Sequence, residues 1–330
     1  MKIKMAAVTV LVALVLTSAL GWFVVTQPLF GAPDRFPTVS VDPARLEKHV
    51  RYFAEDLVPR DWNHPESLDK AAEYIRGEFT AAGARVSDQS YPMEGKTYRN
   101  VIGSFGPEAG AAIVVGAHYD AAGELPGADD NASSVAGLLE LARLLGSMPP
   151  AVPVELVAFT LEEPKTIGGV GMFRSPFGGS AVHAASLVKE QKKIRIVIDL
   201  EMIGFFSDDD GSQSYPARLL GLIYPSRGNF ITVIGKLGQG DSVRRVKSAM
   251  RSASPLPVYS MSAPAFVEGI DWSDHTNYWN AGYEAVMISD TAFYRNTAYH
   301  TIHDTPDRLD YKRMAMVVQG VYAAVLEFAR

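Results

Sequence analysis

The sequence predicts an α/β fold, a three-layer sandwich in which helices flank a central, mostly parallel (mixed) sheet. Short runs rich in β-branched residues alternate along the chain with segments whose apolar residues recur at helical spacing. This alternation is typical of parallel strands joined by helical crossovers. Apolar residues make up 47% of the 330 residues and charged residues 21%, so a packed core is expected rather than disorder.

Each element of this fold has its own signal. The expected strands are short apolar runs at residues 111–120, 152–163, 194–201, 230–236 and 284–290. The expected helices have apolar residues three or four apart and cover 44–57, 67–83, 133–147, 180–191, 241–253, 276–282 and 313–330. In such folds, ligands bind beyond the carboxyl ends of the strands.

The N-terminal residues 1–25 form a separate segment. Lys2 and Lys4 precede an uncharged run over 5–25, which as a helix is about 31 Å long and therefore sufficient to cross a bilayer. Two alternatives stay open: an uncleaved membrane anchor, or a signal peptide with Thr17 and Ala19 before its cleavage site. Both predict export, either anchored in the inner or plasma membrane or secreted or periplasmic after cleavage.

The remaining sequence divides into a linker and one domain. Residues 26–44 are rich in proline and are expected to form the linker, so the folded domain is expected at 45–330. A formal charge of −6, without a basic block, makes nucleic acid an unexpected partner. Because cysteine is absent, disulfides, Cys-ligated zinc and thiol nucleophiles are excluded. Any metal must therefore be held by His, Asp or Glu.

Histidine and acidic residues gather near the ends of the expected strands, which should bring them to one edge of the sheet. Taken singly, a His before a turn, an Asp pair before a helix or a Glu pair is more often structural or solvated. Their conjunction, in the order His, Asp, Glu-Glu, Glu, His, indicates a metal site, because these ligands suit Zn²⁺ or a similar divalent ion. These residues are His118, Asp120, Asp129, Asp130, Glu162, Glu163, Asp199, Glu201, His300 and Asp304.

The motifs also resemble those of a known family. In order, they are GAHYD, PGADDNASSVAGLLELAR, AFTLEE, LEMIG, SDHTNYWNAGYEAVMISDTA and YHTIHDTPDRLDY. Together they resemble the co-catalytic di-zinc aminopeptidases of metallopeptidase family M28, which also contains carboxypeptidases and glutaminyl cyclases. The resemblance implies that 45–330 is a di-zinc peptidase domain with two zinc ions, or other divalent transition metals, as cofactors.

The resemblance implies a role for each motif residue. Glu162 is the implied general base, and Asp120 the implied acid that orients His118. The family often has a cis peptide after the aspartate that bridges both metals, for which the implied residue is Asp129. The implied metal ligands are His118, Asp129, Glu163, Glu201 and His300. Asp130, Asp199, Asp274 and Asp304 are implied to support these ligands or the substrate.

The segment VIDLEMIG, residues 197–204, carries two acids that a strand would direct to the same face. Alignment by its last three residues makes Glu201 the ligand, although the family more often has Asp there. Asp199 lies deeper on the strand and is expected to be a hydrogen-bonded support.

The implied function is a zinc-dependent exopeptidase, an aminopeptidase that cleaves N-terminal residues from peptides through a metal-bridging hydroxide with Glu162 as base. A carboxypeptidase or dipeptidase remains an alternative, because the motifs do not indicate which peptide terminus is held. A glutaminyl cyclase-like acyltransferase is another, although cyclases work with one zinc and ligand candidates for two are present here. A non-catalytic, receptor-like relative is the remote alternative.

Overall fold

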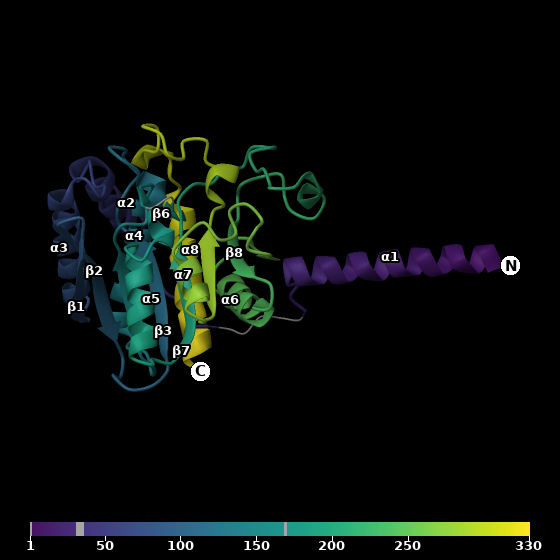
Figure 1. Ribbon diagram of the computed structural model, residues 1–330, viewed down its shortest axis with the longest axis horizontal. Coiled ribbons are helices and arrows are strands. Elements are labelled where there is room, and N and C mark those ends of the chain that lie inside the picture. Colours follow the sequence, from purple (N-terminus) through teal and green to yellow (C-terminus); the bar gives the residue numbers. More distant parts are fainter. Residues whose placement is uncertain (1, 31–35, 168–169) are drawn as a thin grey trace.

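The structure, a computed structural model, describes residues 2–30, 36–167 and 170–330 and confirms the expected α/β sandwich (Figure 1). Eight strands form one sheet in the order β1-β2-β4-β3-β7-β10-β8-β9, and β5 pairs with β6 separately. The large sheet consists of β1 (Arg85–Met93), β2 (Lys96–Phe105), β3 (Ala112–His118), β4 (Val154–Phe159), β7 (Ile194–Leu200), β8 (Ile231–Lys236), β9 (Val258–Ala263) and β10 (Ala285–Ser289). The small pair is β5 (Thr166–Ile167) and β6 (Val170–Gly171).

The centre of the large sheet is parallel. The neighbours β4, β3, β7 and β10 all run in one direction, so their carboxyl ends meet at one edge. The antiparallel pairs lie toward the sides, where β1 pairs with β2, β2 with β4, and β10 with β8. This mixed arrangement gathers the residues that follow β3, β4 and β7 at a single edge.

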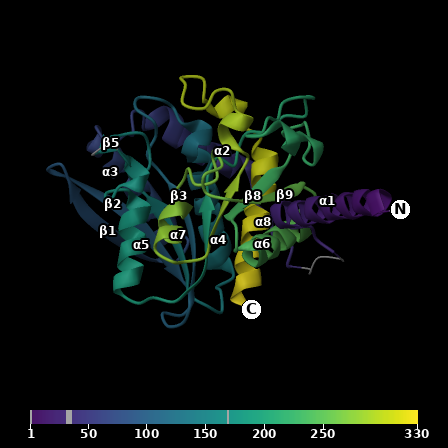
Figure 2. The same ribbon diagram turned by 45° about the vertical axis from the view of Figure 1, so that its right-hand side comes forward.

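Helices cover both faces of the sheet, as Figure 2 shows. One layer holds α2 (Pro43–Arg51), α3 (Pro65–Ala81), α4 (Ser134–Ser147), α6 (Gly240–Ala253) and α8 (Tyr311–Ala329). In Figure 2, α5 (Gly179–Lys189) and α7 (His275–Asn280) lie in front of the sheet, on its other face.

The central strands are buried on both faces, which explains their uninterrupted apolar sequences. In β3, Ile113 and Val115 pack into the core beneath α4 and α8, whereas Val114 packs into the smaller core with Ala184 and Leu187 of α5. All of β3 is buried. A polar residue at the end of such a strand therefore needs a partner or a function.

The N-terminal helix α1 (Lys2–Thr26) projects away from the body (Figure 1). Its end is fixed, because the carbonyl oxygen of Thr26 accepts hydrogen bonds from Lys247 Nζ (2.8 Å) and Ser260 Oγ (2.7 Å). Within the described part of the chain, no helix is both long and apolar enough to cross a membrane. This finding does not support the membrane anchor expected at 5–25. Signal peptide, export and the domain boundaries stay predictions from the sequence, and residues 1 and 31–35 of those segments lie outside the described residues.

Candidate metal centre

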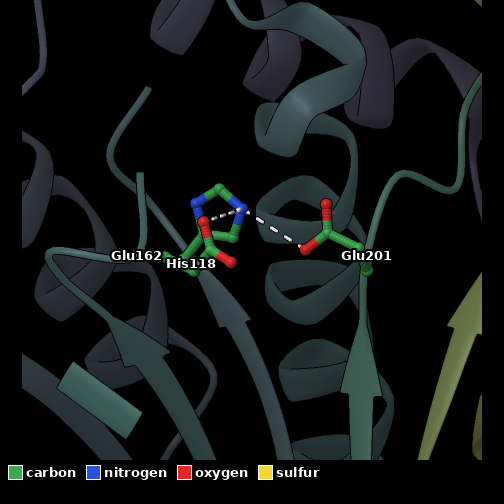
Figure 3. A group of neighbouring side chains, drawn as sticks. All are labelled: His118, Glu162 and Glu201. Carbon is green, nitrogen blue, oxygen red and sulfur yellow. Dashed lines mark ion pairs between the residues drawn. The ribbon is translucent and has the colours of Figure 1, made fainter. Parts of the chain in front are cut away.

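Three neighbouring strand ends carry side chains that point toward one another (Figure 3). His118 is the last residue of β3, Glu162 follows β4, and Glu201 follows β7. His118 Nε2 lies 3.4 Å from Glu201 Oε2 and 3.9 Å from Glu162 Oε2. The three side chains are almost completely buried, and their ligand atoms lie within 4.8 Å of one another.

Asp130 lies between the two histidines of the site. Its Oδ1 is 3.4 Å from His118 Nε2, and its Oδ2 is 3.0 Å from His300 Nε2. Glu163 joins the same group, with Oε2 3.2 Å from His300 Nε2. One carboxylate thus contacts both imidazoles.

The resemblance implies that Asp129 contacts both groups of ligands, but the structure places Asp130 in this position. The Asp129 carboxylate accepts hydrogen bonds from Gly204 N (3.0 Å) and Asn296 Nδ2 (2.8 Å), and it is completely buried away from the histidines. Consecutive residues in this loop direct their side chains to opposite sides, so only one acid of the pair can face the site. The cis peptide likewise follows Asp130.

Left-handed backbone conformations surround these residues. Leu161, Met202 and His300 have φ values of 63°, 50° and 53°, which are uncommon for residues other than glycine and cluster at functional sites. Gly127 has φ 55°, and a Cβ there would lie 2.3 Å from the carbonyl oxygen of Asp130. The loop can therefore bring Asp130 into place only with glycine at position 127.

The donor set fits a divalent cation. Buried atoms without a hydrogen-bond partner include both ring nitrogens of His118, Nε2 of His300 and Oε1 of Glu163. Such atoms are costly unless they are bound, and imidazole with carboxylates is the ligand set that zinc accepts. The residues present thus suit the metals that the sequence predicts.

The electrostatics agree with this reading. Burial raises the pKa of Glu163 to about 8, with the charge of Asp130 adding to it. Burial also raises the pKa of Glu162 well above its usual range; His118 opposes this rise, and the carboxylates of Glu201 and Glu163 add to it. For His300, burial lowers the pKa, but the neighbouring carboxylates of Asp130 and Glu163 outweigh this effect and raise the pKa to about 10. The cluster therefore attracts positive charge.

Asp120 connects two of the strand ends. Its two oxygens accept the backbone N–H groups of Glu162 (3.1 Å) and Glu163 (3.0 Å), and its Oδ1 lies 3.5 Å from His118 Nδ1. This single carboxylate fixes the turn that carries the Glu pair relative to the imidazole.

The two acids of VIDLEMIG contact different partners. Glu201 faces His118 and accepts a hydrogen bond from Ser273 Oγ (2.8 Å). Asp199 instead accepts the backbone N–H of His275 at 3.0 Å, with the ring Nδ1 of the same residue 3.2 Å away. Asp199 therefore holds the start of α7 rather than the metal cluster.

The other two supporting acids are also buried near the site. Asp304 accepts the backbone N–H groups of Asp129 and Asp130, each at 3.1 Å, and so fixes the loop that carries the shared carboxylate. Asp274 is completely buried, and burial together with Asp199 raises its pKa well above the usual range.

Sequence reasoning missed Arg60, a completely buried cation behind the site. Its guanidinium donates to the carbonyl oxygens of Phe53 (2.9 Å), Tyr119 (3.2 Å), Pro126 (2.5 Å) and Gly127 (2.5 Å). It thus joins the chain after His118 to the chain before the Asp pair. A lone arginine in a loop carries no sequence signal for this role.

Tyr299 is a second residue that the motifs did not single out. Its ring stacks on the imidazole of His300, with centroids 3.8 Å apart and planes 16° apart. Its hydroxyl has no hydrogen bond within the part of the chain that the structure describes. It lines both cavities that meet at the site.

The two cavities differ in character. The cleft, of about 260 Å³, is lined by Glu162, Glu163 and His300 on one side and by 172–174 and Trp272 on the other. The apolar cavity, of about 80 Å³, opens beside Glu201. Its lining includes Tyr224, Phe230, Ile234, Met261, Ile270 and Met287. Trp272 and Tyr299 border both.

The chain with this cluster of histidine and acidic residues is similar to known proteins. A family model described as Peptidase family M28 matches residues 100–325. The chain belongs to peptidase family M28. The resemblance seen in the motifs is thereby confirmed.

Several relatives of this M28 chain are known. The chain is 47% identical over 303 residues to the Escherichia coli protein called uncharacterized protein YfbL, covering 89% of this chain and 91% of that protein. It is 26% identical over 241 residues to aminopeptidase YwaD of Bacillus subtilis, covering 70% of this chain but 45% of that protein. Leucine aminopeptidase 1 of Metarhizium robertsii is 22% identical over 290 residues, covering 82% of this chain and 65% of that protein.

Solved structures confirm the fold of this M28 chain. A glutaminyl cyclase from Bacteroides thetaiotaomicron has a TM-score of 0.67 at 20% identity, with 88% of this chain and 99% of that chain covered. A leucine aminopeptidase precursor from the same organism has a TM-score of 0.66 at 20% identity, covering 88% and 98%. Peptidases and a cyclase thus share this fold, and family membership makes peptides the expected substrates.

Proposed function

We propose that this M28 protein is a metal-dependent aminopeptidase that hydrolyses the first peptide bond of its substrates. The observation that carries the proposal is the position of Asp130 between His118 and His300, with Glu162 beside them at the wall of the cleft. The named aminopeptidases among its relatives support the same reaction class.

Two zinc ions are the proposed cofactors, and the geometry divides their ligands into two groups. His118 and Glu201 would hold one ion, His300 and Glu163 the other, and Asp130 would contact both. When bound, the metal pair supplies Lewis acidity and an acidified water at neutral pH.

Glu162 is the proposed general base. It lines the cleft, and its carboxylate lies 3.9 Å from His118 Nε2, farther than the carboxylates of Asp130 and Glu201. It would hold the proton of the attacking water on one carboxylate oxygen and pass it to the leaving nitrogen. The Asp120 carboxylate fixes its backbone and thus its direction.

Tyr299 is proposed to stabilise the charge that develops on the scissile carbonyl oxygen. Its hydroxyl has no hydrogen-bond partner in the described residues, and it borders both cavities beside His300. A preorganised O–H donor in a site that excludes water lowers the energy of an oxyanion.

The apolar cavity predicts which first residue the enzyme prefers. A side chain buried among Phe230, Met261 and Met287 beside Glu201 gains from apolar burial, whereas a charged one loses its hydration. Among p-nitroanilides, kcat/KM should be at least about tenfold higher for leucine or phenylalanine than for lysine or aspartate. Equal rates for leucine and lysine would contradict this use of the cavity. Thr232→Phe, which fills the cavity, should depress the phenylalanine substrate more than the alanine one.

The function is tested with matched peptides that differ only at their ends. Release of the first residue from free peptides, and none from N-acetylated ones, is the expected result. Cleavage of acetylated peptides from their C-terminus would instead indicate a carboxypeptidase. Loss of ammonia from a peptide with N-terminal glutamine, without peptide cleavage, would indicate a glutaminyl cyclase.

A further inference from the structure

Arg174 is the only arginine or lysine among the described residues that line the two cavities. It belongs to a short 3-10 turn, Met172–Arg174, which lines the cleft together with Glu163 and His300. Its side chain is about 39% exposed. The cleft therefore has one arginine among the same lining residues as the proposed metal ligands Glu163 and His300.

The guanidinium of Arg174 uses only one of its three nitrogens, Nη2, to contact the described residues. Its Nη2 pairs with Asp271, at 3.0 Å from Oδ2 and 3.2 Å from the carbonyl oxygen. The ring of Phe173 supports it, 5.1 Å from the guanidinium carbon. Nε and Nη1 make no hydrogen bond in the part of the chain that is described. A planar cation with a fixed corner and unused donors is suited to a second carboxylate.

The two cavities would receive the residues on either side of the scissile bond. The side chain of the first residue fits the apolar cavity beside Glu201, so the residue after the scissile bond lies in the cleft with Phe173, Arg174 and Trp272.

We infer that Arg174 binds a carboxylate on the residue that follows the scissile bond, with the free C-terminus of a dipeptide as the expected source. The inference rests on the proposed aminopeptidase function. The same carboxylate could come from the free C-terminus of a dipeptide or from an acidic side chain at the second position. Asp271 positions the guanidinium for either source.

Three substrates separate these cases: leucylglycine, leucylglycinamide and leucylaspartic acid α-amide. For the zinc-loaded full chain, kcat/KM should be higher for leucylglycine than for its amide. Arg174→Gln should lower the ratio of these two values by about 10- to 100-fold, mainly through KM, because it removes a charge-assisted hydrogen-bond pair. Arg174→Lys should restore part of the loss.

Arg227→Gln is the matched control, since Arg227 forms an exposed pair with Asp210 and does not line either cavity. A ratio that Arg174→Gln leaves unchanged, or lowers no more than Arg227→Gln does, would overturn the inference. If the variant affects the aspartyl amide instead of leucylglycine, the carboxylate comes from a side chain. Absence of hydrolysis of all three substrates by the unaltered protein would refute the proposed function, whereas hydrolysis independent of Arg174 would refute only this inference.

Discussion

Glu162→Gln is expected to lower kcat by about 10²- to 10⁴-fold while the protein keeps its full metal content. Glutamine preserves the shape of the side chain but cannot take a proton from water or return it to the leaving nitrogen. The backbone contacts of residue 162 with Asp120 remain available to the variant. The measurement is steady-state hydrolysis of a leucine anilide together with metal analysis of the same sample.

Glu124→Gln provides the control for this experiment. Glu124 is exposed in the loop that follows β3, so its amidation removes the same charge without touching the cluster. It should hydrolyse the anilide at the rate of the unaltered protein. Near-normal turnover in Glu162→Gln would refute the assignment of the base, and loss of metal would show that Glu162 is a ligand instead.

Asp130→Asn and Asp129→Asn should differ sharply although they alter adjacent residues in the same way. Asp130 contacts both histidines, so its variant should lose at least one metal ion per chain and at least about 100-fold in activity, beyond the 10- to 100-fold typical of partners outside the coordination shell. Asp129→Asn should keep both ions, and its activity should stay within about tenfold of that of the unaltered protein. Burial and the nearby charge of Asp290 already raise the pKa of Asp129 well above its usual range, so the neutral amide resembles its neutral form.

Metal analysis by mass spectrometry of the two purified variants decides between them. Retention of both metals by Asp130→Asn, with their loss in Asp129→Asn, would reverse the placement described here. Circular dichroism on both variants shows whether either change has disturbed the fold.

Much of the fold could be predicted because its central strands are buried on both faces. The short apolar runs that correspond to β3, β4 and β7 lie between helical segments, and this pattern predicts buried strands. The antiparallel pair β1 and β2 was missed, because β1 is half exposed and its polar residues give no apolar run. β9 was missed for a similar reason, since its sequence VYSMSA mixes serines with apolar residues.

The site was predictable where chemistry depends on residue type at a strand end, as for His118 and Glu201. It was not predictable where two like residues are adjacent, because the direction of each side chain depends on loop geometry. For this reason the motif points to Asp129 as the shared ligand, although Asp130 faces the histidines. Arg60 and Arg174 act through contacts with segments far away in the chain, and no local pattern indicates such contacts.

The most direct test of the account is a zinc titration of the chelator-treated protein, followed by hydrolysis of a leucine anilide and of its N-acetylated form. Hydrolysis of the free anilide should disappear on chelation and return to a maximum at two equivalents of zinc. The acetylated form should not be cleaved at any stage. Hydrolysis that survives complete removal of metal would contradict it.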